Sequence, residues 1–291
     1  YCDGYTWRII LDELQNVLQG SANAYSSSDV FGKTRRRFMD LAIENSTSSD
    51  AFYGNTIQDP FKGWSNFTFE SSNYLEWEWS IDETRWFQFS DEIGKTANER
   101  FLFLFVKTWI EIGYSSTTIF FETHGRSYTG IPELSETLGW FTQFFPVFTT
   151  SWPKLETLSI EIAQQFSELP ANGLTYMALD DWHKPPFPVL LNYLGNFDED
   201  RGALAIPSSI SQGNMTDPSN PALSVVEVNS MIMEGKMKWM IRVHPDLDPA
   251  PFRDTLNTFV SSMISGKIAP DYIAGSIDQD DLDAIGDIIG G

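Results

Sequence analysis

The sequence predicts an α/β fold with a mixed sheet, with α+β as the alternative class. Two observations carry this prediction. Some segments repeat apolar residues at helical spacing, others alternate apolar and polar residues at strand spacing, and the two kinds alternate along the chain. The chain has 291 residues, 42% hydrophobic and 14% aromatic, which is enough to bury a large core. We find no internal repeat, and the length suits one large or two ordinary domains.

The first segment is predicted to be an amphipathic helix ending at Gly20, with its polar face in solvent. One apolar stripe defines it: Trp7, Ile10, Leu11, Leu14 and Leu18. The Ser-rich stretch 21–29 is a candidate linker before a second helix at 32–45. That helix carries a basic run, Lys33 and Arg35 to Arg37, which favours a solvated helix face over an anion site.

The middle of the chain predicts a core helix between strands. Residues 73–81 alternate apolar and acidic side chains, as a half-buried strand does. The helix at 93–111 is too apolar for a surface helix, so we expect it in the core. Residues 117–123 are β-branched and aromatic, which suits a central strand. Residues 139–150 predict another strand, in which Pro146 marks a break or an edge.

The last part of the chain predicts a helix, three strands and a closing helix. The helix covers 152–166, with Pro153 near its start. Residues 186–197 form a strand, and 222–233 pairs with 236–244 as a hairpin joined by Glu234 and Gly235. A helix at 250–265 and an acidic tail follow.

Composition excludes several partners and sites. The formal charge is 19 − 40 = −21, which repels nucleic acid and anionic membrane surfaces. The longest apolar runs, such as 101–106, are too short to span a bilayer. Cys2 is the single cysteine, so no internal disulfide forms and we expect a reducing, cytoplasmic setting. The three histidines, His124, His183 and His244, stand in unrelated contexts, so we predict no metal site.

One cluster of chemically capable residues remains after the standard motifs are excluded. The chain has no phosphate loop, dinucleotide fingerprint, nucleophile elbow or zinc-binding His pair. Residues 122–127, ETHGRS, place Glu122, His124 and Arg126 at the end of a buried strand. Strand ends often expose functional groups in α/β proteins. Taken alone, the segment also fits a simple salt bridge between Glu122 and Arg126.

Four segments in a fixed order indicate a family. ETHGRS resembles the EGHGRE motif of epimerization domains in nonribosomal peptide synthetases. Three later segments resemble further motifs of that family: SETLGWFTQFFPV (135–147), LPANGLTYMAL (169–179) and LLNYLGNFD (190–198). The opening YCDGYTW resembles the end of the family's HH-x-x-x-DG-x-S-W motif, with Asp3 and Gly4 as its DG and Thr6 for the Ser.

The resemblance implies a chloramphenicol-acetyltransferase-like two-layer sandwich, mostly the C-terminal half of a V-shaped pseudo-dimer with its site in the central tunnel. Residues 1–28 would end an N-terminal subdomain, 29–270 would form the C-terminal subdomain, and 271–291 would be an acidic linker. The start resembles a cut inside the motif, with both motif histidines just before Tyr1. The N-terminal subdomain is then a partner of this chain.

The resemblance also implies a reaction. An aminoacyl or peptidyl thioester arrives on the 4′-phosphopantetheine arm of a peptidyl carrier protein, and its α-carbon is inverted from L to D without a directly bound cofactor. Glu122 would be one catalytic acid or base, and Tyr193 would supply or orient the proton on the opposite face. Asn192 would donate an amide hydrogen bond. Burial would raise the pKa of such a glutamate toward neutrality.

Each implied role has a plainer alternative. Asp3 and Gly4 would be structural, with Asp3 holding the motif loop through an ion pair. Arg126 would orient Glu122 or touch substrate, and His124 would bind substrate or pack beneath the loop. Tyr193 also fits a core tyrosine with a satisfied hydroxyl.

Five positions depart from the family pattern: Thr123, Ser127, Glu136, Thr175 and Met177. Side chains at former glycine positions add bulk and restrict the backbone. Two other functions therefore remain open: a condensation-type acyltransferase that forms amides, and a non-catalytic half-domain that docks a carrier protein.

Overall fold

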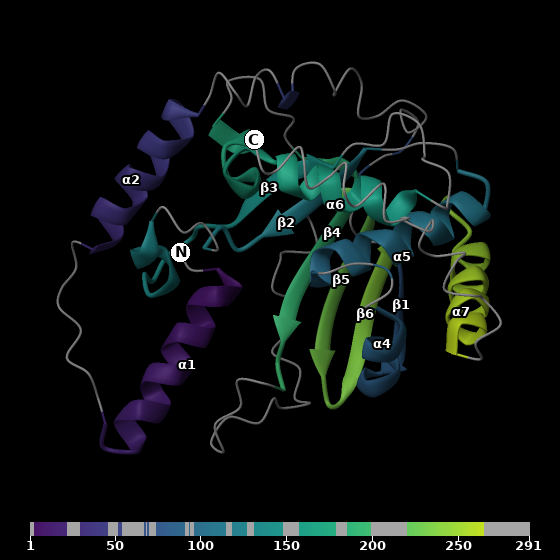
Figure 1. Ribbon diagram of the computed structural model, residues 1–291, viewed down its shortest axis with the longest axis horizontal. Helices are drawn as coiled ribbons and strands as arrows, with labels where there is room; N and C mark the ends of the chain where they lie inside the picture. Colours follow the sequence, from purple (N-terminus) through teal and green to yellow (C-terminus); the bar gives the residue numbers. More distant parts are fainter. Residues whose placement is uncertain are drawn as a thin grey trace, which may run out of the picture.

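The structure is a computed structural model, shown in Figure 1. It describes residues 3–21, 30–45, 52–53, 67, 69, 74–90, 93, 96–114, 118–126, 131–147, 157–178, 185–198 and 220–264. Some predictions lie outside these residues: most of the 21–29 linker, the acidic segment 271–291, Pro153, His183, Ser127 and Cys2.

A six-stranded mixed sheet forms the centre of the fold, which confirms the predicted α/β class. Its strands lie in the order β1-β6-β5-β4-β2-β3. Their bounds are β1 Leu75–Asp82, β2 Ile119–Thr123, β3 Gln143–Val147, β4 Phe187–Asn196, β5 Ser224–Met233 and β6 Lys236–Val243. The β2–β4 and β4–β5 pairs are parallel and the other three are antiparallel. Three central strands therefore send their carboxyl ends in one direction.

Helices flank this sheet (Figure 1). Their bounds are α1 Gly4–Leu18, α2 Val30–Glu44, α4 Glu83–Ser90, α5 Ala97–Glu111, α6 Leu158–Glu168 and α7 Ala250–Ile264. In the view of Figure 1, α1 and α2 lie at the left and α7 at the right. Helix α4, which directly follows β1, was not predicted from the sequence. Helix α6 was predicted at 152–166, whereas it begins at Leu158 and continues to Glu168.

The helix α5 lies in the core, as its apolar sequence predicts. Every residue from Phe101 to Trp109 is buried. A capping box begins the helix: the Thr96 hydroxyl accepts from the Glu99 backbone, and the Glu99 carboxylate accepts from the Thr96 backbone. The buried residues of α5, α6 and α7 join one face of the sheet in a single apolar cluster. This cluster contributes most of the apolar burial that stabilises the fold.

Turn and edge residues lie where their chemistry predicts. Glu234 and Gly235, at the tip of the β5–β6 hairpin, both have positive φ, as a tight two-residue turn requires. Pro146 lies in β3, the last strand of the sheet order. An edge strand tolerates the missing N–H of proline because no further strand needs it.

The apolar stripe of α1 does not meet the core. Trp7, Leu11, Leu14 and Leu18 are between 47% and 65% exposed, and Thr6 is the one buried side chain within this fully described helix. The expectation that only the polar face meets solvent is therefore wrong. The reason is that α1 is tied to the described residues near its N-terminus, by Asp3, Thr6 and Arg8, and extends away from them.

A second, smaller apolar cluster joins α2 to the segment after β2. Phe38 of α2 packs there with Ile131, Leu134, Phe141 and Leu174. Elsewhere on α2, Lys33, Arg36 and Arg37 are exposed, which agrees with the predicted solvated helix face. This cluster fixes the loop that carries Gly139 and Phe141 close to the start of α1.

Candidate active site

The turn after β2 presents the ETHGRS residues at the end of the strand. Glu122 and Thr123 end β2, and His124, Gly125 and Arg126 form the turn. Gly125 has φ +68, and a Cβ there would overlap the carbonyl oxygen of Phe141. The Arg126 N–H donates to His124 Nδ1 at 3.1 Å, which tightens the turn. Glycine is needed here for both backbone angle and space.

A buried ion pair connects this turn to the start of α1. Arg126 Nη1 lies 2.9 Å from Asp3 Oδ2, and both side chains are almost fully buried. Asp3 also caps α1 by accepting from the Thr6 N–H, and it accepts from the Phe141 N–H. The network has the pairing that the resemblance implies for Asp3. The Glu122–Arg126 bridge is wrong as an alternative, because the guanidinium is directed to Asp3.

The rest of the Arg126 guanidinium is also committed. Its Nη2 donates to the carbonyls of Thr137 and Gly139 and to the Thr6 hydroxyl, at 3.0 to 3.2 Å. The Thr6 hydroxyl donates to the Gly139 carbonyl at 2.7 Å, so threonine serves where the family motif has serine. Breaking such a pair leaves an uncompensated buried charge, which costs about 3–5 kcal/mol. Arg126 therefore holds the loop rather than Glu122.

Glu122 lies on the sheet face opposite the one that α5 covers, because its neighbour Phe121 contacts Phe101 of that helix. Its partners in register are Asn192 on β4 and, one strand further, Asn229 on β5. In parallel strands, residues at one register point to the same face. The Glu122 side chain therefore shares a face with two amides.

The environment of Glu122 favours its protonated form. Its pKa is raised from 4.5 to about 7, mainly by burial and then by the negative charges of Glu227 and Asp3. A carboxyl group with this pKa exchanges protons readily near neutral pH.

His124 packs against α1. Its ring stacks on Tyr5 with centroids 4.7 Å apart. The pKa of His124 is lowered to about 4, mainly by burial and then by the Arg126 charge. Because Nδ1 accepts from the Arg126 N–H, the neutral ring carries its proton on Nε2.

The structure separates the two residues chosen from NYLG. Asn192 shares the face of Glu122, but the next residue of a strand points to the other face. The Tyr193 side chain accordingly packs against the main core cluster. The structure brings Asn192 to Glu122 and does not bring Tyr193 there. Gly4 opens α1, where a Cβ would meet no atom within 4 Å, so space does not require glycine.

The positions that depart from the family pattern lie around the site rather than beside Glu122. Thr123 follows Glu122 on β2, so its side chain takes the opposite face. Glu136 is exposed. Thr175 is fully buried and donates to the Pro170 carbonyl at 3.4 Å, and Met177 Sδ accepts from the Phe144 N–H. These two added side chains have found contacts in the short turns beside β3.

A polar group on the same sheet face was not predicted from the sequence. Glu227 and Asn229 are two residues apart in β5, and Asn229 Nδ2 donates to Glu227 Oε1 at 2.9 Å. Arg242 on β6 lies 3.8 Å from Glu227 and 3.2 Å from Glu76 on β1. The signal was available: in SVVEVNSMIM, two polar side chains alternate with buried valines.

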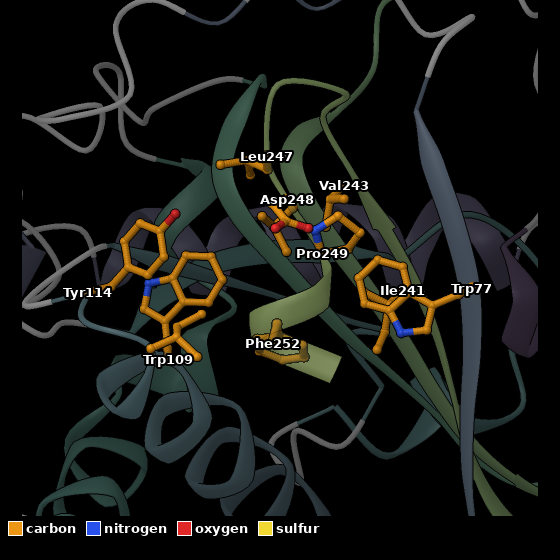
Figure 2. Close-up of a pocket in the computed structure, with 11 residues that line it drawn as sticks. Trp77, Trp109, Tyr114, Ile241, Val243, Leu247, Asp248, Pro249 and Phe252 are labelled. Carbon is orange, nitrogen blue, oxygen red and sulfur yellow. The ribbon is translucent and has the colours of Figure 1, made fainter. Parts of the chain in front are cut away.

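A pocket on the other face of the sheet is a separate feature. Figure 2 shows Trp77, Trp109, Ile241, Phe252 and Asp248 around it, at the start of α7. Trp77 and Ile241 are register partners on the face opposite Glu122. The cavity measures about 30 Å³ and is lined mainly by apolar side chains. It is remote from the carboxylates and amides described above and too small for a thioester substrate.

The described part of the chain offers no metal site and no membrane span. Within it, no group of three or more His, Cys, Asp or Glu side chains is placed to hold a metal ion. Across the same residues, none of the helices has the length and hydropathy needed to cross a bilayer.

Sequence comparison places the chain among peptide synthetases, although no protein-family model matches it. Malformin synthetase of Aspergillus sclerotiicarbonarius is 26% identical over 232 residues, covering 68% of this chain and 4% of that protein. N-(5-amino-5-carboxypentanoyl)-L-cysteinyl-D-valine synthase of Penicillium rubens is 30% identical over 169 residues, covering 53% and 4%. A plipastatin synthase of Bacillus subtilis is 21% identical over 339 residues, covering 99% and 13%. The chain thus spans a small part of each relative.

Solved structures with the same fold come from several branches of one superfamily. The epimerization domain from the third module of tyrocidine synthetase B matches with a TM-score of 0.67 and 17% identity, over 91% of this chain and 67% of that one. The EpoB cyclization-docking bidomain from Sorangium cellulosum matches with a TM-score of 0.54 and 12% identity, over 92% and 58%.

The fold is that of condensation-superfamily domains, which confirms the predicted chloramphenicol-acetyltransferase-like class. Together with the sequence relatives, it identifies the chain as a condensation-superfamily domain of the nonribosomal peptide synthetase type.

Proposed function

We propose that this domain epimerises the α-carbon of an aminoacyl or peptidyl thioester held on the phosphopantetheine arm of a peptidyl carrier protein. The observation that carries the proposal is Glu122, a buried carboxyl group at a strand end with a pKa of about 7. Amide-forming condensation does not call for a glutamate at this position. A relative whose name includes D-valine and a neighbour that is an epimerization domain add support.

The chemistry follows from the acidity of the thioester α-carbon. A base takes the α-proton, the electron pair moves into an enolate, and a proton returns to the other face of the carbon. Glu122 is the acid or base on one face, and a histidine of the upstream motif serves the other face. Asn192 lies in register with Glu122 and offers its amide to the developing oxyanion. Tyr193 has no part in this scheme, because its side chain lies in the core.

Deuterium washout tests the proposal. The domain is prepared with the upstream sequence that completes its histidine motif, and a carrier protein is loaded with an α-deuterated aminoacyl group. Loss of deuterium to water with formation of D-product is expected, and Glu122→Gln should lower the rate at least about 100-fold, as loss of a general acid or base does. Glu78→Gln, an exposed change on the same sheet face, is the matched control.

The outcomes separate the competing functions. No washout with folded protein and loaded carrier contradicts epimerisation. Amide formation with an added acceptor would then favour the condensation activity, for which the cyclization and condensation neighbours argue. Carrier binding without either reaction would favour a docking half-domain.

A further inference from the structure

The site face of the sheet carries a row of polar side chains that ends in a charged group. Glu122, Asn192 and Asn229 occupy one register across three parallel strands. Glu227 lies two residues before Asn229, on the same face. The four side chains therefore form one surface that extends from β2 to β5.

Glu227 is held in a fixed position by two different contacts. Asn229 Nδ2 donates to one carboxylate oxygen at 2.9 Å, and Arg242 Nη1 lies 3.8 Å from the other. Arg242 is itself shared with Glu76 at 3.2 Å, and its guanidinium lies 4.6 Å from the centre of the Tyr74 ring. The positive charge that faces Glu227 is therefore divided between two carboxylates.

The charges around Glu122 come from three elements. From α1, Asp3 faces it, but this carboxylate is neutralised by its ion pair with Arg126. The turn after β2 adds His124, which is neutral. Neighbours in register on β3 and β4 are Phe144 and Asn192, which do not titrate. From β5, Glu227 contributes a charge that Arg242 offsets only at 3.8 Å.

We infer that Glu227 is a positioning residue for the proposed epimerisation: it orients the Asn229 amide and favours the protonated form of Glu122, while Arg242 limits that effect. The inference rests on the proposed function for its biological meaning, but the coupling between the two glutamates is a physical property of this sheet. Like charges on one partly desolvated surface disfavour each other's ionisation. A glutamate that must both take and return a proton at neutral pH benefits from this setting.

Two substitutions move the pKa of Glu122 in opposite directions. Glu227→Gln removes the like charge and keeps the side-chain shape, so the pKa falls. Arg242→Met removes the opposing charge, so the pKa rises. Each shift should be roughly half a pH unit, as expected for unit charges about 10 Å apart at intermediate effective dielectric.

The measurement is a direct titration. The chain is labelled with ¹³C at the glutamate side-chain carboxyl carbon, and the Glu122 resonance is assigned by its loss in Glu122→Gln. Its midpoint is then followed by NMR in wild type, Glu227→Gln and Arg242→Met. Glu78→Gln is the control, since it removes a carboxylate from the same face at the exposed edge strand, where screening is strong.

A lower midpoint in Glu227→Gln, a higher one in Arg242→Met and no change in Glu78→Gln support the inference. Equal midpoints in the first two variants and wild type overturn it. The same variants in the washout assay should shift the pH profile as they shift the titration, with Glu227→Asp restoring part of the profile. A shifted titration in a protein without washout would contradict the proposed function and leave the glutamate coupling established.

Discussion

Glu122 combines a buried position with a pKa near neutrality, and this makes the residue detectable in stability as well as in activity. Its folded pKa of about 7 exceeds the ordinary value of 4.5. The folded state therefore binds the proton more tightly than the unfolded state. This contribution to stability is fully present below pH 4.5 and is lost as the pH rises through about 7.

Glu122→Gln should consequently stabilise the fold above neutral pH. At about pH 8, we expect its free energy of unfolding to exceed that of wild type by roughly 3 kcal/mol, and the difference should vanish at low pH. Urea unfolding across this pH range measures it. Glu78→Gln should track wild type throughout, because that side chain is exposed. A Glu122→Gln difference that is constant with pH would contradict the raised pKa.

The turn after β2 shows how much one element depends on a backbone position. Gly125 and Gly235 have nearly equal φ, +68 and +69, but a Cβ at Gly235 would meet nothing within 4 Å. Replacing each by alanine therefore separates two costs. The left-handed backbone alone costs about 1–2 kcal/mol. At Gly125 the overlap with Phe141 adds to it.

Gly235→Ala should lose about 1 kcal/mol of unfolding free energy and Gly125→Ala at least about 3 kcal/mol, by the strain and overpacking that such sites impose. Chemical denaturation provides both values. We also expect Gly125→Ala to disturb the ring stacking of His124 on Tyr5, because it displaces the loop that carries His124. Equal losses in the two variants would show that the loop relaxes around the new methyl group.

Most of the sheet could be predicted from the sequence. Strands β1, β2, β4 and the β5–β6 hairpin follow from alternation, β-branched content and the Glu234–Gly235 turn. The apolar helix α5 was likewise predicted in the core. Missed were α4, which immediately follows a strand, and the start of α6. The exposure of α1 was also missed, because amphipathic spacing identifies an apolar face without identifying what covers it.

For the molecule as a unit, the net charge of −21 is the dominant feature. Such an excess of one sign destabilises the compact state through self-repulsion, which salt screens. We expect the thermal midpoint at pH 7 to rise when NaCl is increased from about 0.02 to 0.15 M. At a pH near the sequence pI of 4.3 the same salt change should have little effect. A fall of the midpoint at pH 7 would mean that attractive pairs outweigh repulsion.

The fold class, the superfamily and the choice of Glu122 as a candidate could all be predicted before folding was considered, because periodicity and ordered motifs are local properties of the chain. Which residues act together could not. Arg126 pairs with Asp3, 123 positions away, because the turn after β2 meets the start of α1. Strand register placed Asn192 beside Glu122, and strand alternation sent Tyr193 into the core. Burial and charge then set the pKa of Glu122, and both depend on neighbours that only the tertiary structure brings together.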